Sequence, residues 1–238
     1  MRLAAVCAFI FTVALARADQ ARCPGTASAF EPNGAKLAKL DAGADRMLEI
    51  LAIGSSSTEG IGASSPSNAY PARLEEELTH DDGIAADVRN AGVGGELAVK
   101  TLQRLKAALK ARWAELVIWQ VGTNDALVGV DESLFRATVE SGVAAARAAG
   151  VPLLLVDPQF TQKNPDEARY ERFVEIVDEI GARDHVSVLS RFAMMKRRGT
   201  KDAQALLSKD GLHMNDLGYR CLAHAIAEAI EDWTAAKL

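Results

Sequence analysis

The chain has 238 residues, of which 49% are hydrophobic and 25% are charged. This is enough apolar material for one sizeable core, so the sequence predicts a single globular domain once any targeting segment is set aside. Acidic residues outnumber basic ones and give a formal net charge of −5 at pH 7. An acidic surface argues against nucleic acids and anionic membranes as partners.

Residues 1–18 have the pattern of a secretory signal peptide. Arg2 precedes an apolar stretch, residues 3–16, and Ala16-Arg17-Ala18 supplies the small residues of a cleavage site. The apolar stretch of about 14 residues is shorter than the roughly 20 residues that span a bilayer. We therefore expect cleavage, export to the periplasm or the cell exterior, and no stable membrane insertion afterwards.

Residues 19–46 are rich in Ala, Gly, Pro and Asn, and we expect a leader segment with one short helix around Lys36–Leu40. The main domain is expected over residues 47–238. Because Cys7 leaves with the signal peptide, Cys23 and Cys221 remain in the mature chain. An oxidising compartment favours a disulfide between them, and the alternative is a pair of buried thiols.

From residue 47 onward, short aliphatic runs alternate with helical patterns. Apolar strands that alternate with helices form a parallel sheet covered on both faces. The sequence therefore predicts a three-layer α/β/α sandwich with a five-stranded parallel sheet in a flavodoxin-like order. The strands are expected at Met47–Ile53, Ala86–Arg89, Leu116–Val121, Val151–Val156 and Val186–Leu189, and the helices at Pro71–Thr79, Glu96–Ala111, Asp131–Ala149, Asn164–Gly181 and Asp216–Trp233.

The helix before the last predicted strand has capping signals at both ends. Asn164 is expected as its N-cap, Pro165 as its first residue and Glu167 as the N3 residue that completes the cap. Gly181 is expected to end it, because glycine readily adopts the left-handed conformation beyond a helix terminus.

Polar loops follow the predicted strands at the edge where parallel sheets bind ligands. Each loop alone has an ordinary structural explanation, because serines cap helices and glycines allow tight turns. The glycine-rich loop has neither dinucleotide-binding spacing nor the lysine of a P-loop. The loops are Gly54–Gly60, Asn90–Gly95, Gly122–Asp125 and, after a short helical excursion, Asp210–His213.

Together the four loops contain the groups that acyl transfer needs. A serine hydroxyl requires a base, and the base requires a carboxylate that fixes its tautomer. His213 and Asp210, three residues apart, fit these two roles. The backbone N–H of Gly95, the side-chain amide of Asn124 and the N–H of Ser56 fit the donors that a developing oxyanion needs.

The four blocks resemble those of the SGNH hydrolases, the GDSL esterase/lipase family, in order and over about residues 48–225. The resemblance implies that Ser56 is the nucleophile, that His213 and Asp210 complete a catalytic triad, and that Gly95 and Asn124 form the oxyanion hole with the Ser56 amide. No cofactor is expected.

The first block departs from the family pattern at one position. The family has Gly-Asp-Ser, whereas this chain has Gly54-Ser55-Ser56. In the family the aspartate mainly braces the loop and is not the triad acid. The resemblance therefore implies that Ser55 affects the geometry of the loop more than catalysis.

Two rival assignments fit the sequence poorly. The α/β-hydrolases require a Gly-x-Ser-x-Gly elbow, which the chain lacks because position 58 is threonine. A metal site is not expected, since His80, His185 and His224 are scattered along the chain.

The sequence thus predicts an exported serine esterase that hydrolyses carboxylic esters through an acyl-enzyme. Short, acetyl-type esters on a small-molecule or polysaccharide substrate are favoured, because residues 58–68 are mostly small and polar and 5% of the chain is aromatic. The alternatives are a long-chain acyl thioesterase or lysophospholipase of the same family, an acyltransferase, and a non-catalytic glycan-binding domain. The oligomeric state stays open.

Overall fold

The computed structural model describes Cys23 and residues 46–164, 166–196 and 199–235. The signal peptide, the short helix expected around Lys36–Leu40 and Pro165 lie outside the described residues. No helix in the described part of the chain is long and apolar enough to cross a membrane.

Within the described residues, five parallel strands form one sheet in the order β2-β1-β3-β4-β5, which confirms the predicted flavodoxin-like order. In the register of β1 and β2, Gly54 lies opposite Gly92. The first two polar loops therefore leave the sheet side by side. The strands are β1 (Leu48–Gly54), β2 (Ala86–Gly92), β3 (Leu116–Gln120), β4 (Leu153–Val156) and β5 (Ser187–Leu189).

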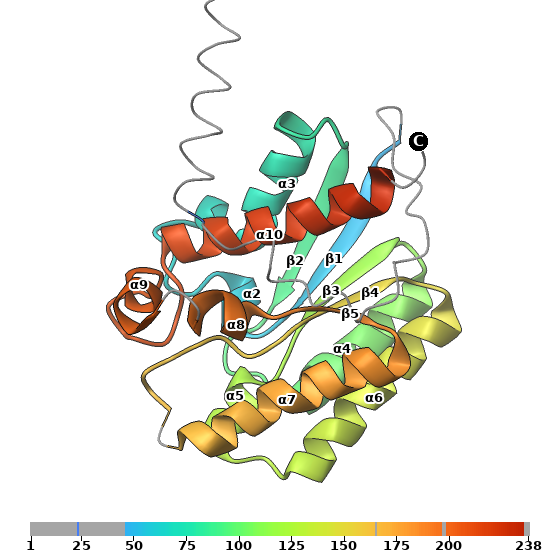
Figure 1. Ribbon diagram of the computed structural model, residues 1–238. Helices are drawn as coiled ribbons and strands as arrows, with labels where there is room; N and C mark the ends of the chain where they lie inside the picture. Colours follow the sequence, from blue (N-terminus) through green and yellow to red (C-terminus); the bar gives the residue numbers. More distant parts are fainter. Residues whose placement is uncertain (1–22, 24–45, 165, 197–198, 236–238) are drawn as a thin grey trace, which may run out of the picture.

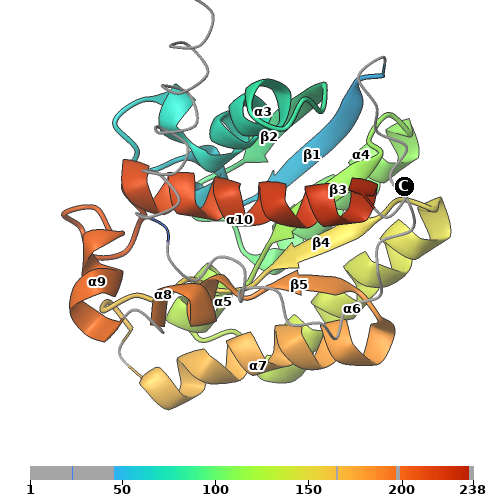
Figure 2. The same ribbon diagram turned by 45° about the horizontal axis from the view of Figure 1, so that its top comes forward.

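Helices cover both faces of this sheet (Figures 1 and 2). Successive strand residues point to opposite faces, so Ile50 and Leu51 belong to two different buried apolar clusters of the described residues. One face carries α3 (Tyr70–His80) and α10 (Asp216–Ala235), and the other carries α4 (Ala98–Ala111), α6 (Glu132–Ala149) and α7 (Glu167–Asp184).

Short helical elements gather at the carboxyl edge of the sheet, toward which the strand arrows point in Figure 1. These short elements lie between residues 56 and 205, so this edge is built from segments far apart in the sequence. They are α2 (Ser56–Glu59), η2 (Pro66–Asn68), α5 (Thr123–Val128), α8 (Arg191–Lys196) and α9 (Gly199–Ala205).

Helix α7 differs from its prediction at both ends. Its N-cap is Asp166, whose side chain accepts a backbone N–H from the first turn, whereas the Asn164 side chain accepts the N–H of Asp166 in the preceding loop. The helix also continues past Gly181 to Asp184. A Cβ at Gly181 would lie 2.3 Å from the Val188 side chain, so this glycine permits close packing of α7 on β5 rather than ending the helix.

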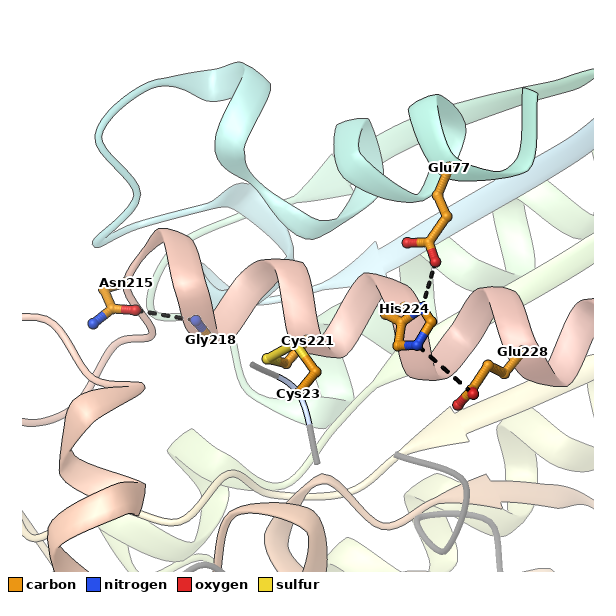
Figure 3. The surroundings of a disulfide bond; sticks show 7 residues. All are labelled: Cys23, Glu77, Asn215, Gly218, Cys221, His224 and Glu228. Atoms are coloured by element: carbon orange, nitrogen blue, oxygen red, sulfur yellow. Dashed lines mark hydrogen bonds and ion pairs between the residues drawn. A yellow bond between two sulfur atoms is a disulfide. The ribbon is translucent and has the colours of Figure 1, made fainter. Parts of the chain in front are cut away.

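A disulfide joins Cys23 to Cys221 of α10, which confirms the predicted pairing. The two cysteines are 198 residues apart in sequence, their Cα atoms are 5.3 Å apart, and both are buried. Figure 3 shows the bridge one turn from His224, whose ring bonds Glu77 of α3. The hydrogen bond to Glu77 raises the pKa of His224. Helix α10 is thus linked to Cys23 by a covalent bond and to α3 by the hydrogen bond between His224 and Glu77.

Reduction of the disulfide, or Cys23→Ser with Cys221→Ser, is expected to lower the free energy of unfolding by about 2–5 kcal/mol, because the cross-link closes a long loop of the unfolded chain. Urea unfolding followed by circular dichroism, with and without reductant, measures the change. Reductant should affect the wild type and leave the double variant unchanged. Equal stability of the oxidised and reduced wild type would contradict a stabilising cross-link.

Candidate active site

The candidate nucleophile Ser56 is the first residue of α2, immediately after the end of β1. The preceding Ser55 is buried, and both its N–H and its hydroxyl donate to Oε1 of Gln120, at 3.0 and 3.1 Å. Gln120 is the last residue of β3 and is itself buried. Ser55 is therefore held by two hydrogen bonds to the end of the neighbouring strand β3.

Ser56, His213 and Asp210 form a hydrogen-bonded chain. The Oγ atom of Ser56 lies 3.0 Å from Nε2 of His213, and Nδ1 of His213 lies 2.6 Å from Oδ2 of Asp210. With the Nδ1 proton donated to the carboxylate, Nε2 is left as the acceptor for the serine hydroxyl. The fold brings together residues 157 positions apart in an arrangement suited to activating a nucleophile.

The carboxylate of Asp210 is held in its charged form. Its Oδ1 atom accepts the backbone N–H groups of Leu212 and His213 at 2.8 and 2.9 Å, and the hydroxyl of Ser208 at 2.8 Å. Burial favours the neutral acid, but the hydrogen bonds from His213, the backbone and Ser208 outweigh it and hold the pKa of Asp210 well below its usual value. An ionised Asp210 can stabilise an imidazolium at His213.

The two other candidate oxyanion donors lie in neighbouring loops. Asn124 is in the first turn of α5, and its Nδ2 donates to the carbonyl of Glu96 at 2.9 Å. That bond uses one of the two amide hydrogens and leaves the second for a ligand. Gly95 has a φ of +77°, and a Cβ at this position would meet no atom within 4 Å, so open space borders its backbone.

Carboxylates on both sides fix the segment that carries Gly95. Glu59 of α2 accepts the N–H of Gly94 at 2.6 Å, and both oxygens of Asp125 accept the N–H of Ala98 at 3.1 Å. Burial raises the pKa of Asp125 to about 6, although the Ala98 hydrogen bond opposes the shift. The candidate oxyanion loop is thereby attached to the elements that carry Ser56 and Asn124.

The loop after the nucleophile packs against the candidate base. Both the N–H and the hydroxyl of Ser64 donate to Asp216 at the start of α10, at 2.7 and 2.6 Å. Gly62 has a φ of +94°, and a Cβ there would lie 2.9 Å from Cβ of His213. The loop therefore forms one wall beside the imidazole and leaves little space between them.

Comparison with known protein families gives a match to the non-GDSL lipase-like family over residues 22–236, most of the chain. The chain belongs to this family. The family match and the relative described below make the chain an SGNH hydrolase. Solved structures described as lipolytic proteins of the G-D-S-L family also match and have the same fold. The description non-GDSL agrees with Ser55 at the position of the family aspartate, and the matched range includes most of the segment expected as a leader.

Several relatives resemble the chain over most of its length. Esterase TesA of Pseudomonas aeruginosa is 27% identical over 164 residues, which are 69% of this chain and 78% of the relative. The lipase/acylhydrolase of Enterococcus faecalis matches with a TM-score of 0.70 and 22% identity, covering 78% of this chain and 96% of that one. A two-domain esterase active on acetylated mannans matches with a TM-score of 0.63 and 21% identity, covering 79% and 50%.

Sequence reasoning did not identify the residues whose side chains hydrogen-bond to the catalytic loops and hold them in place. It assigned no supporting role to Gln120, Gln159, Glu59 or Arg191. The available signal was a polar residue at the end of an apolar strand run, which is costly to bury without a partner.

Among the described residues, no group of three or more His, Cys, Asp or Glu side chains could hold a metal ion.

Ser56→Ala is expected to abolish ester hydrolysis, because it removes the attacking oxygen. Ser55→Ala loses one hydrogen bond, worth about 1 kcal/mol, and should reduce turnover by less than about tenfold. Initial rates on an activated acetyl ester measure both variants, with circular dichroism as the folding control. An active Ser56→Ala beside an inactive Ser55→Ala would move the nucleophile to position 55.

Asn124→Ala is expected to lower kcat by roughly 10²–10³ with little change in KM, because one oxyanion donor is lost. Steady-state kinetics measure the effect, and a thermal melt checks that the loss of the Glu96 contact leaves the protein folded. A folded variant with the kcat of the wild type would limit Asn124 to a structural role at the start of α5.

Proposed function

We propose that this carboxylic ester hydrolase of the SGNH type is an exported enzyme that cleaves short, acetyl-type esters of a polar or carbohydrate substrate through an acyl-enzyme. The observation that carries the catalytic part is the hydrogen-bonded chain from Ser56 to Asp210 through His213. The intact set of candidate groups favours catalysis over glycan binding without turnover.

In the first half-reaction, Oγ of Ser56 attacks the ester carbonyl carbon while Nε2 of His213 takes the hydroxyl proton. The carbonyl oxygen becomes an oxyanion, which the N–H groups of Ser56 and Gly95 and the Asn124 amide stabilise. His213 then gives its proton to the leaving alcohol. In the second half, water deprotonated by His213 attacks the acyl-enzyme, and collapse releases the acid and restores Ser56.

The preference for short acyl chains is supported by the walls of the site. The loop that follows the nucleophile is small and polar, and Ser64 and Gly62 attach it closely to α10 and to His213. A cavity of about 430 Å³ has Thr161 in its wall, and Thr161 donates to the Gly211 carbonyl at 2.8 Å. None of Ser56, Asp210 and His213 lines this cavity, so it is not assigned to the acyl group.

Two independent observations support export and the substrate class. The signal-peptide pattern of residues 1–18 agrees with the Cys23–Cys221 disulfide, which persists in oxidising compartments. One structure of the same fold is described as an esterase active on acetylated mannans, so the fold is compatible with polysaccharide esters.

The kcat/KM for p-nitrophenyl esters is expected to fall at least tenfold between the acetyl or butyryl ester and the octanoyl ester, because a small polar site gives a long chain no apolar groove. The panel should be run with the Ser56→Ala variant as the control for background hydrolysis. Acetate release from acetylated xylan or mannan then tests the carbohydrate substrate.

Each other outcome favours a stated alternative. A profile that rises through octanoyl and decanoyl esters would favour the long-chain thioesterase or lysophospholipase. Transfer of acetyl groups to an added sugar in place of water would favour an acyltransferase. Binding of acetylated glycans without turnover of any ester would favour the non-catalytic domain.

A further inference from the structure

A buried polar cluster lies beneath the catalytic edge and has no role in the steps of acyl transfer. Gln159 and Arg191 are 0% exposed, and so is Asp157, which precedes Gln159 in the segment after β4. Buried amides and guanidinium groups are unfavourable unless their hydrogen bonds are satisfied. The partners of these side chains therefore indicate what the cluster does.

The side chain of Gln159 joins the two loops that carry Ser56 and His213. Its Oε1 atom accepts the hydroxyl of Ser57, the residue after the candidate nucleophile, at 2.9 Å. Its Nε2 atom donates to the carbonyl of Leu212, the residue before the candidate base. One planar amide thus spans the gap between the neighbours of two groups that must stay in hydrogen-bond contact.

Arg191 fixes the orientation of that amide. Its Nη1 atom donates to Oε1 of Gln159 at 3.2 Å, so both groups that face this oxygen, the Ser57 hydroxyl and the guanidinium, are donors. The amide nitrogen must therefore face the Leu212 carbonyl. Nη2 of Arg191 also donates to Oγ1 of Thr123 at 3.3 Å, the residue before Asn124. The cluster therefore reaches the third catalytic loop as well.

The position of Arg191 is set by β4 and β5. Nε and Nη2 both donate to the backbone carbonyl of Asp157, at 3.2 and 2.8 Å. The Asp157 carboxyl group accepts the Ser190 hydroxyl at 2.7 Å and the Phe192 N–H at 3.0 Å. Burial raises the pKa of Asp157 to about 7. The guanidinium is thus held by rigid backbone at the ends of two strands.

We propose that Gln159, oriented by Arg191, is a positioning residue that sets the separation of the Ser56 and His213 side chains. This role rests on the proposed catalytic triad. Displacement of reacting groups by about 1 Å can reduce turnover about 10²-fold. A link between Ser57 and Leu212 limits such displacement, because each is covalently adjacent to one member of the pair.

The decisive variant is Gln159→Glu, which keeps the shape of the side chain and its acceptors for Ser57 and Arg191. In its ionised form, which the Arg191 guanidinium favours, it replaces the N–H donor with an oxygen that faces the Leu212 carbonyl. The link to the His213 loop is then lost, and a negative charge is added beside Arg191. We expect kcat to fall about 10–100-fold, within the range for slight misplacement. KM for the acetyl ester should stay nearly constant, and the rate of Ser56 phosphonylation by an activated phosphonate should fall with kcat.

Ser190→Ala is the matched control. It removes the buried hydrogen bond to Asp157 in the same cluster, and the same hydroxyl also accepts the N–H of Ala193 in α8, which is not a residue of a catalytic loop. It should lower the melting temperature and leave kcat and the phosphonylation rate near those of the wild type. Gln159→Glu should lower both rates at a melting temperature no lower than that of this control.

The outcomes separate the two proposals. An inactive Ser56→Ala together with a Gln159→Glu variant of normal kcat would overturn the positioning role and leave the triad intact. Equal losses of kcat in Gln159→Glu and Ser190→Ala would reduce the cluster to a stability role and overturn it too. An active Ser56→Ala would overturn the triad and the positioning role together.

Discussion

The parallel register of the strands is the constraint on which the site depends. Because every strand runs in the same direction, the loops after β1, β2, β3 and β5 meet at one edge, and Gly54 opposite Gly92 places the first two side by side. Arg104 of α4 strengthens this junction by donating to the carbonyls of Gly54 and Ala91 at 3.1 and 2.6 Å. Four segments distant in sequence are thereby held side by side at one edge of the sheet.

The two faces of the sheet and its carboxyl edge are stabilised by different kinds of interaction. The faces are covered by apolar side chains, whose burial is tolerant of small adjustments. The edge is supported by buried polar groups, whose directional bonds fix geometry more strictly. Gln120 holds the loop before Ser56, while Gln159 and Arg191 hold the loops beside it. Amides and a guanidinium are therefore buried where the reacting atoms must be placed accurately, although their burial is unfavourable in free energy unless they are hydrogen-bonded.

The strand pattern and the chemical types of the loops were sufficient to predict the sheet order and the groups that meet at its edge. Alternating apolar runs have few topological solutions, and a serine in one loop with an aspartate and a histidine three residues apart in another have few joint uses. The ends of α7 were predicted wrongly because Gly181 serves a contact with Val188, which no local pattern contains. Gln159 and Arg191 were missed for the same reason, since their partners lie in other segments of the chain.

Ser55, which stands where the family pattern has aspartate, depends on such a non-local partner, Gln120. The N–H of Ser55 needs an acceptor, and Oε1 of Gln120 supplies it, which fixes the orientation of that amide. An ionised aspartate at this position would bring a second acceptor toward the same oxygen, whereas the serine hydroxyl is a donor and bonds it at 3.1 Å. Ser55 and Gln120 are therefore chemically matched. The brace of the nucleophile loop is retained with a neutral pair, and no additional buried charge lies next to Ser56.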